Sequence, residues 1–280
     1  MTLRIAIKVA YFNTHDFAHG FQIQPDVDTI FSFLQKAFIK CQFLEERDEK
    51  IDYAGRTDHG VNAICQVIAI NLSNKWKTIP DRFLQRINSC LPDNIRCWSC
   101  AVVHEDFHPR FDAIDRTYHY IYTKRANDSI DIQLMLEAKN LLVGSHNFIN
   151  FAKKNTDVDN YIRQIQEILI DEYTGYFIFS LKAKSFLWQQ CRRIVAHLIQ
   201  IGKKQVKIDL TKKLLLNDKS ITKPTPLPAE NLILSNISYD EAIFTDNISV
   251  KLKIMEKLNE EIYETKTKEN FLIFLNKMFL

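Results

Sequence analysis

The chain alternates between two kinds of hydrophobic pattern, one with a period of two and one with a period near 3.6. Period-two or continuous apolar runs predict strands, and they cover 4–12, 61–72, 116–124 and 176–187. In the last run every second residue is apolar, so four side chains share one face: Phe177, Phe179, Leu181 and Ala183.

Apolar residues three and four apart predict amphipathic helices between these strands. We expect a first helix that Asp28 caps and whose apolar face consists of Ile30, Phe33, Leu34, Ala37 and Phe38. Further helices are expected at 81–90, 132–144 and 188–202, and the tail from about Ser249 is again amphipathic. Gly144 and Gly202 are expected to end the helices that precede them.

The order of these elements predicts an α+β protein with two domains. Both halves run strand, helix and then strands, which places an N-terminal domain over 1–105 and a C-terminal domain with the helical tail over 106–280. A duplication is inferred from element order alone, since no fixed-period repeat is found. A cleft between two sheet-containing halves is a natural place for a site.

Composition narrows the class of protein. The 280 residues, of which 46% are hydrophobic, supply enough material for two cores. No run of about 18 apolar residues could span a bilayer. The N-terminal MTLRIAIKVAYF lacks the apolar run and cleavage site of a secretory signal. We therefore expect a cytoplasmic protein.

Six cysteines are expected to be free thiols, because a disulfide framework is improbable without a secretion signal. Cys97, Cys100, His104 and His108 are of the types that zinc prefers. Only three residues separate Cys100 from His104, however, and IRCWSCAVV also indicates a buried strand. We predict no metal and keep a zinc protein as an alternative.

The net charge of +3 is too small to indicate a nucleic-acid partner by itself. The segment 182–207 is more informative, because it holds cations and no acidic residue: Lys182, Lys184, Arg192, Arg193, Lys203, Lys204 and Lys207. Such a block suits contacts with phosphates, and a solvated face explains it equally well.

The segment AGRTDHGVNA at 54–63 places Arg56, Thr57 and Asp58 between two glycines, just ahead of a predicted buried strand. Turn-forming residues alone can explain it. Alternatively, a neighbouring arginine keeps a partly buried carboxylate ionised, so that it can act as a nucleophile or base. No dinucleotide motif or P-loop is present, and no cofactor is expected.

Five segments, in order, resemble the TruA-type tRNA pseudouridine synthase family. GRTDHGVNA is close to the GRTDxGV signature around that family's catalytic aspartate. YFNTHDFAHGFQIQP is similar to its opening loop, LPDNIR with FHPRFDAIDRTYHYIY to its central block, and SFLWQQCRRIV and PAENLIL to its later segments. The resemblance implies the pseudouridine synthase fold, in which two similar domains, each a mainly antiparallel sheet with helices on one face, flank an active-site cleft.

By this resemblance Asp58 is the catalytic carboxylate that converts uridine to pseudouridine in tRNA. It could add to the base, attack C1′ or remove a proton from C2′, and the sequence does not choose among these routes. Each needs an ionised, desolvated Asp58, and Arg192 is the expected ion-pair partner. Tyr118 matches the family's active-site tyrosine, whose ring can stack on uracil and whose hydroxyl can assist loss of the C5 proton.

Substrate-binding roles are assigned to Arg56, Tyr118, Leu232, Leu234, Lys184 and Arg193. Arg56 is expected to hold a phosphate or the flipped nucleotide. A leucine of the PAENLIL segment should line the pocket beneath the base. Arg193 must point about 100° away from Arg192 on the helix and would contact the RNA backbone instead.

Members of the family act on the anticodon stem-loop of tRNA, typically at positions 38, 39 and 40, as homodimers in which one RNA touches both subunits. The target base must be extruded from the folded RNA. Four positions depart from or vary within the family's pattern, namely Asn13, His59, Asn62 and Asn231. They remove no charged catalytic group but leave the target uridines open. A synthase acting on other RNA sites and a non-catalytic tRNA-binding protein remain alternatives.

Overall fold

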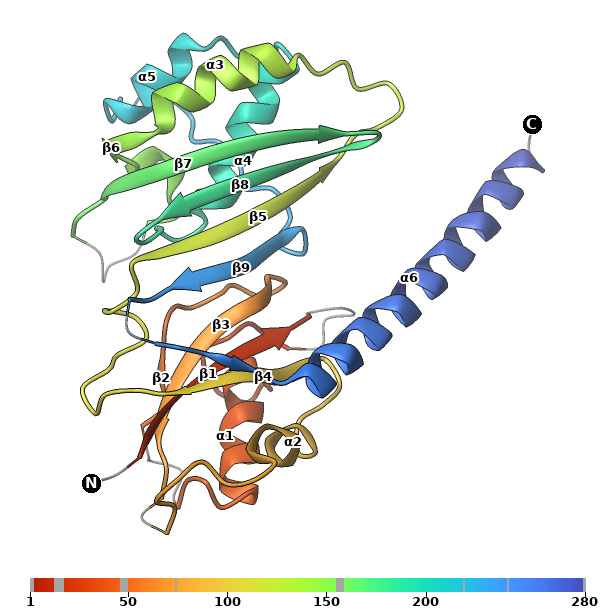
Figure 1. Cartoon of the computed structure of the whole chain (residues 1–280). Helices are drawn as coiled ribbons and strands as arrows, with labels where there is room; N and C mark the ends of the chain where they lie inside the picture. The colour runs from red at the N-terminus through yellow and green to blue at the C-terminus, as the bar shows by residue number, and fades with distance from the viewer. Residues whose placement is uncertain are drawn as a thin grey trace.

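The computed structural model describes residues 3–12, 18–45, 50–73, 75–154, 159–218, 220–240 and 242–278. The predicted position Asn13 lies outside these ranges. The described chain forms a large, mostly antiparallel sheet accompanied by helices (Figure 1), which confirms the α+β class predicted from the sequence.

The first half of the chain supplies strands and two helices. Their bounds are β1 (Arg4–Tyr11), α1 (Ile30–Lys40), β2 (Asp52–Tyr53), β3 (Asn62–Asn71), α2 (Phe83–Asn88) and β4 (Ile95–Val102).

The second half is longer and ends in an extended helix. Its elements are β5 (Asp115–Thr123), α3 (Ile132–Leu142), β6 (Gly144–Asn147), the 3-10 turn η2 (Ile149–Phe151), β7 (Ile162–Tyr173), β8 (Tyr176–Ala183), α4 (Gln190–Gly202), α5 (Asp209–Leu215), β9 (Leu232–Ser238), β10 (Thr245–Asp246) and α6 (Ile248–Lys277).

The strands form one sheet in the order β10-β4-β1-β3-β9-β5-β8-β7-β6, with β2 paired to β3. Among the described strands, the pairing of β3 with β9 is the only parallel one. It spans only two residue pairs, Asn62 with Ile233 and Ala63 with Leu234. This β3–β9 seam therefore joins the strands of the first half to those of the second.

Two hydrophobic clusters lie on either side of the seam. The first packs β1, β3, α1 and α2, and the second packs β5, β7, β8, α3 and α4. Leu234 belongs to the first cluster and Leu232 to the second, so β9 contributes to both. The predicted division into domains near Glu105 stays a prediction.

Strand β8 confirms the period-two pattern, because Phe177, Phe179, Leu181 and Ala183 are all fully buried. Strand β7 beside it is absent from the sequence prediction. Its pairing with β8 shifts register between Ile165 and Glu167, so its apolar side chains do not keep a strict alternation. A bulge of this kind hides a strand from pattern analysis.

The prediction that Asp28 caps α1 is wrong by one residue. Thr29 is the cap: its hydroxyl accepts a hydrogen bond from the Ser32 backbone N–H at 3.1 Å, and the Ser32 hydroxyl oxygen accepts one from the Thr29 N–H at 3.0 Å. This reciprocal capping box satisfies two backbone donors, whereas a single cap satisfies one. Asp28 instead forms an exposed ion pair with Lys36.

Gly202 ends α4, as predicted, but for a packing reason. A Cβ at this position would lie 2.8 Å from the Ile130 side chain and 2.9 Å from that of Met135. The absence of a side chain therefore lets α4 approach α3 closely. The left-handed backbone conformation occurs two residues later, at Lys204.

The cysteines and histidines near β4 have neighbours of their own. Burial raises the pKa of the Cys97 thiol well above its ordinary value. His108 Nδ1 accepts a hydrogen bond from the Arg110 N–H at 3.1 Å, and His108 Nε2 lies 3.4 Å from Asp52. Within the described ranges, no three His, Cys, Asp or Glu side chains gather in a way that could hold a metal ion. No described helix is long and apolar enough to cross a membrane.

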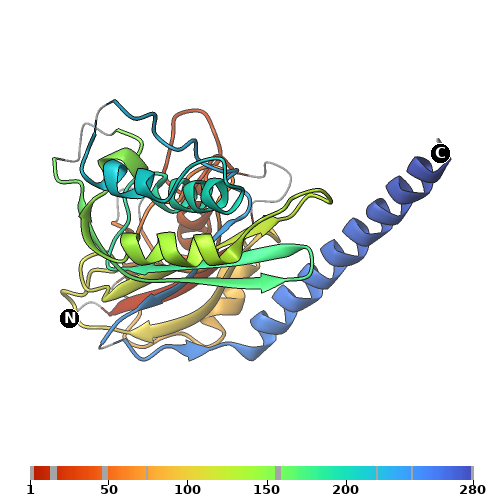
Figure 2. The same ribbon diagram turned by 90° about the horizontal axis from the view of Figure 1, so that it is seen from above.

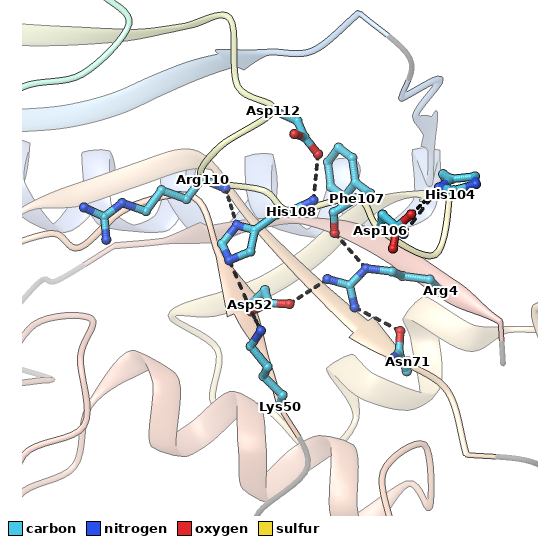
Figure 3. A network of polar contacts seen from close by, with 10 residues as sticks. All are labelled: Arg4, Lys50, Asp52, Asn71, His104, Asp106, Phe107, His108, Arg110 and Asp112. Carbon is cyan, nitrogen blue, oxygen red and sulfur yellow. Dashed lines mark hydrogen bonds and ion pairs between the residues drawn. The ribbon is translucent and has the colours of Figure 1, made fainter.

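A buried ion pair fixes the edge of the first half (Figure 3). The Arg4 guanidinium donates to Asp52 Oδ2 at 2.6 Å, to Asn71 Oδ1 at 2.9 Å and to the Phe107 carbonyl at 2.7 Å. One side chain thus ties β1 to β2, to the end of β3 and to the segment that leads from β4 to β5.

The charge balance at Asp52 favours the ionised carboxylate. Burial alone would raise its pKa, but hydrogen bonds from Arg4 and Lys50 and the nearby His108 ring outweigh burial, so the pKa of Asp52 lies below its ordinary value.

We expect Asp52→Ala to lower the free energy of unfolding by about 3 to 5 kcal/mol, because the buried Arg4 guanidinium is left without its carboxylate. The folded state lowers the pKa of Asp52. The wild-type advantage should therefore be complete above the ordinary carboxylate pKa and shrink as pH falls through the lowered value. Urea denaturation at several pH values measures both. The exposed Asp106→Ala is the matched control, and equal destabilisation of the two variants would contradict the assignment.

Candidate active site

Asp58 lies in the turn between β2 and β3, and neighbouring segments hold that turn in place. The Tyr11 and Thr57 hydroxyls lie 2.7 Å apart in a buried hydrogen bond. The Gln66 amide donates to the Gly55 carbonyl at 2.8 Å, and the Phe21 N–H donates to the Thr57 carbonyl at 3.2 Å. Strands β1 and β3 and the segment after residue 18 therefore position the carboxylate before any substrate binds.

Gly20 allows the segment after residue 18 to approach this turn closely. Its φ of +89° is one that side chains disfavour. A Cβ here would also lie 3.1 to 3.3 Å from backbone atoms of Thr57, Asp58 and His59. A larger residue would strain the backbone and push against the turn that carries Asp58.

Arg192 reaches Asp58 from α4, 134 residues away in sequence. Its Nη1 lies 3.4 Å from Asp58 Oδ2, and its Nε donates to the Leu227 carbonyl at 2.6 Å. The Arg192 side chain is 13% exposed and that of Asp58 31%, so water screens the ion pair only in part. The predicted partner of Asp58 is therefore the residue that contacts it.

Burial and charge act on Asp58 in opposite directions. Burial raises the pKa of the carboxyl, and it outweighs the lowering effects of the Arg192 and Lys153 charges and of a hydrogen bond from Trp188. The pKa of Asp58 therefore lies above its ordinary value. The carboxylate is charged but poorly solvated, which makes it more basic than a carboxylate in water.

Trp188 and Lys153 are two neighbours of Asp58 that the sequence analysis missed. Besides its hydrogen bond to Asp58, Trp188 supports Lys153, whose Nζ lies 4.0 Å from the centroid of the indole ring. The Lys153 N–H donates to the Trp188 carbonyl at 2.9 Å. The indole is 42% exposed, so a large flat surface borders the carboxylate. Only the tertiary fold brings Lys153 here, and no local pattern signals it.

Tyr118 lies on β5 with its ring edge-on to Phe186, at a centroid distance of 5.4 Å. It pairs directly with Leu234 on β9, and Tyr120 pairs with Leu232. Burial raises the pKa of the Tyr118 phenol well above its ordinary value, and nearby Asp58 adds to the effect. The phenol is therefore held neutral next to the ion pair.

Arg116, two residues before Tyr118, connects the Asp58 turn to the second half of the chain. Its guanidinium donates to the Ala54 carbonyl at 2.8 Å, to the Arg110 carbonyl at 2.9 Å and to the Lys184 carbonyl. Burial lowers the pKa of Arg116 below its ordinary value. This residue binds backbone from both halves, so it aligns the turn that carries Asp58 with the segment that precedes α4.

The other predicted substrate-binding residues lie at different distances from this centre. Arg56 is exposed on the same turn, and its Nε lies 3.3 Å from the Tyr53 hydroxyl. The side chain of Lys184 is exposed. Arg193 points away from Asp58, and it donates to the Pro224 carbonyl and to Gln189 Oε1.

The basic block of 182–207 divides in the structure. Lys182 pairs with Asp115, Lys203 with Asp128 and Lys204 with Asp131, at 3.3, 2.7 and 3.3 Å. These three cations are therefore partly neutralised. The uninterrupted charge of the sequence does not make one continuous basic face, because acidic residues from elsewhere in the chain pair with it.

A different set of cations surrounds the Asp58 site. Lys223 is close enough to Arg193 and Lys154 for both to lower its pKa below the ordinary value, after burial itself. The Lys223 Nζ donates to the Ile149 carbonyl at 2.7 Å, beside the segment that carries Lys153. We call Lys153, Lys154, Arg193 and Lys223 the basic rim. Three separate segments build it.

These groups can perform acid–base or nucleophilic chemistry on a flat, uncharged ring. Asp58 supplies a basic carboxylate, Arg192 a fixed positive charge, and Tyr118 and Trp188 flat surfaces with hydrogen-bond donors. The basic rim can hold phosphates beside them.

Comparisons with known proteins point in one direction. A sequence profile described as tRNA pseudouridine synthase matches residues 138–240. The protein called tRNA pseudouridine synthase A from Methanosarcina mazei is 35% identical, over 89% of this chain and 90% of its own length. The proteins of the same name from Archaeoglobus fulgidus and Bacteroides fragilis are 34% and 32% identical, and each alignment covers 86% of this chain and 86% and 98% of theirs.

We expect Arg192→Met to raise the pKa of Asp58 further, by about one to three units, because the nearest cation is removed. Carbon-13 NMR titration of the aspartate carboxyl groups measures it. Arg193→Met is the matched control, since it removes the neighbouring charge that points elsewhere. Equal shifts in the two variants, or none in either, would contradict the ion pair.

Proposed function

Since this chain belongs to the tRNA pseudouridine synthase family, we propose that Asp58 is its catalytic carboxylate and that its targets are uridines 38, 39 and 40 of the anticodon stem-loop. As a member of this family, the protein is an isomerase that acts on tRNA. The observation that carries the assignment of Asp58 is the Asp58–Arg192 contact beside Tyr118.

The reaction rearranges one nucleotide without adding or removing atoms. The bond from N1 of uracil to C1′ breaks, the base turns, a bond from C5 to C1′ forms, and the proton on C5 is replaced by one on N1. Asp58 can serve by adding to the base, by attacking C1′ or by taking a proton from C2′. Its raised pKa supports all three roles, because a poorly solvated carboxylate is the better nucleophile and base.

Tyr118 and Leu234 are proposed to hold the uracil beside Asp58. They lie directly across from each other on β5 and β9, so an aromatic ring and an apolar side chain stand side by side. The raised pKa of Tyr118 favours stacking and hydrogen-bond donation over action as a base, because a neutral phenol must first lose its own proton. Leu232, across from Tyr120, extends the same apolar surface.

RNA binding is proposed to use the basic rim and the exposed cations Arg56 and Lys184. The target uridine must leave its stack to reach Asp58, and backbone contacts on either side of it offset that cost. Arg56 stands on the same turn as Asp58 and is exposed, which suits a contact with the flipped nucleotide or its phosphate. We further propose that the protein acts in the cytoplasm and as a homodimer.

We expect Asp58→Ala to abolish pseudouridine formation at positions 38, 39 and 40 while the Kd for tRNA changes by less than about threefold, because the carboxylate acts in chemistry more than in binding. Chemical mapping of pseudouridine in transcripts, together with filter binding, measures both. The exposed Asp240→Ala is the matched control.

Turnover by the Asp58→Ala variant would refute the catalytic assignment. Modification of other uridines by the wild type would refute the positions but leave the role of Asp58 intact.

We expect Lys153→Ala and Lys223→Ala to weaken tRNA binding and to reduce the slope of log K against log salt by about 0.7 to 0.9 for each phosphate that the variant no longer neutralises. Binding titrations over a range of salt concentrations give the slope. Lys124→Ala is the matched control, because Lys124 already pairs with Glu172 at 2.6 Å. An unchanged slope in the Lys153 and Lys223 variants would exclude the basic rim from RNA binding.

A further inference from the structure

Helix α6 leaves the body of the protein and projects into solvent along most of its length (Figures 1 and 2). It begins beside β4, where β10 pairs with that strand and Asn247 caps the helix. Val250 is its only buried residue within the described part of the chain. A helix of 30 residues is about 45 Å long, so its far end lies well away from the sheet.

Apolar side chains follow a heptad spacing along this exposed helix. Ile248, Met255 and Ile262 are seven residues apart, and Leu258 and Leu272 occupy a second line with Thr265 between them. These two lines correspond to the a and d positions of a coiled coil. The tip adds five consecutive exposed apolar residues, Phe271 to Leu275, of which Phe271 is 60% exposed.

This surface needs a covering partner. Long helices derive most of their stability from packing an apolar face, and a run of exposed apolar residues marks an interaction site. A shallow apolar hollow on the helix is lined by Thr265, Glu269, Leu272 and Asn276, which are successive a and d positions. The side of α6 that lacks a partner is thus the side that a second helix would cover.

Charge limits the kind of partner. Helix α6 carries six lysines and five glutamates, a balance close to neutral that offers little attraction to phosphates. Glutamates occur throughout the turns between Glu256 and Glu269, whereas a helix that lies on a membrane keeps a cationic polar face. A protein helix of complementary charge is the partner that fits.

We propose that α6 pairs with α6 of a second copy of this chain in an antiparallel two-stranded coiled coil. With the two-fold axis near Glu260, facing residues are equally distant from position 260. Ile248 then faces Leu272 of the other copy, and Leu258 faces Ile262. Both contacts occur twice by symmetry.

The charged a and d residues fit the same register. Lys251 faces Glu269 of the second copy, so the two charged positions in the seam pair with opposite sign. A parallel pair would instead place Lys251 against Lys251 and Glu269 against Glu269. Antiparallel pairing also places each apolar tip beside the base of the other helix, where Ile243 is 87% exposed. Sequence and exposure thus select one orientation and one register.

Charge reversal on the full-length protein tests this register, with sedimentation equilibrium as the measurement. The wild type should have twice the 32.9 kDa mass of one chain. Lys251→Glu and Glu269→Lys should each raise the dimer Kd by about tenfold, and the double variant should restore it. Lys253→Glu and Glu260→Lys are matched controls, because both residues lie on the outer face of the helix, and neither should change the Kd.

Ile262→Glu should give a monomer with unchanged circular dichroism of the body, since this side chain touches no other part of its own chain's core. A dimer that survives Ile262→Glu, a wild-type monomer, or a monomer that floats with phosphatidylcholine–phosphatidylserine vesicles would each overturn the pairing. Pseudouridine formation by the same wild-type sample is scored separately. Its absence would count against the proposed function and leave the pairing untouched.

Discussion

A carboxylate that stays charged while partly removed from water is the constraint on which the site depends. Burial of Asp58 favours its neutral form, and Arg192 and Lys153 oppose that effect from a distance in sequence. The arrangement works only if the cation is held as firmly as the anion. The Leu227 carbonyl fixes Arg192, and hydrogen bonds to Thr57 fix the turn that carries Asp58.

The sheet brings these groups together. Asp58 immediately precedes β3, Tyr118 lies on β5, and β9 between them pairs with both strands. Arg116 spans the same junction through carbonyls of Ala54 and Lys184. The two hydrophobic clusters support the site from either side without filling it, because their boundary runs between Leu232 and Leu234. The site is thus a product of the junction rather than of either half.

The sequence predicted the parts of the site that have local signatures. Asp58, Arg192 and Tyr118 each stand in a motif of fixed spacing, and the structure brings the three together. Lys153, Trp188 and Lys223 carry no such motif, and their role as neighbours depends on how η2, α4 and a loop fold against one another.

The same distinction explains the fold. Regular alternation identifies β8, whereas a register shift hides β7. The predicted cap of α1 falls on Asp28 instead of Thr29 because both residue types cap helices, and only the reciprocal bond with Ser32 decides between them. The basic block resembles one surface in the sequence, which does not show that Asp115, Asp128 and Asp131 return to pair with it.

The β3–β9 seam has a mechanical consequence. Strands β1 and β3 pair over seven residue pairs, but β3 and β9 over two, so the sheet has its lowest bending stiffness directly beneath Asp58. Flexure along this line separates the two halves like the covers of a book, at the expense of few backbone bonds. The Asp58–Arg192 contact spans that line as a clasp, and a nucleotide seated between the halves would set how far they close.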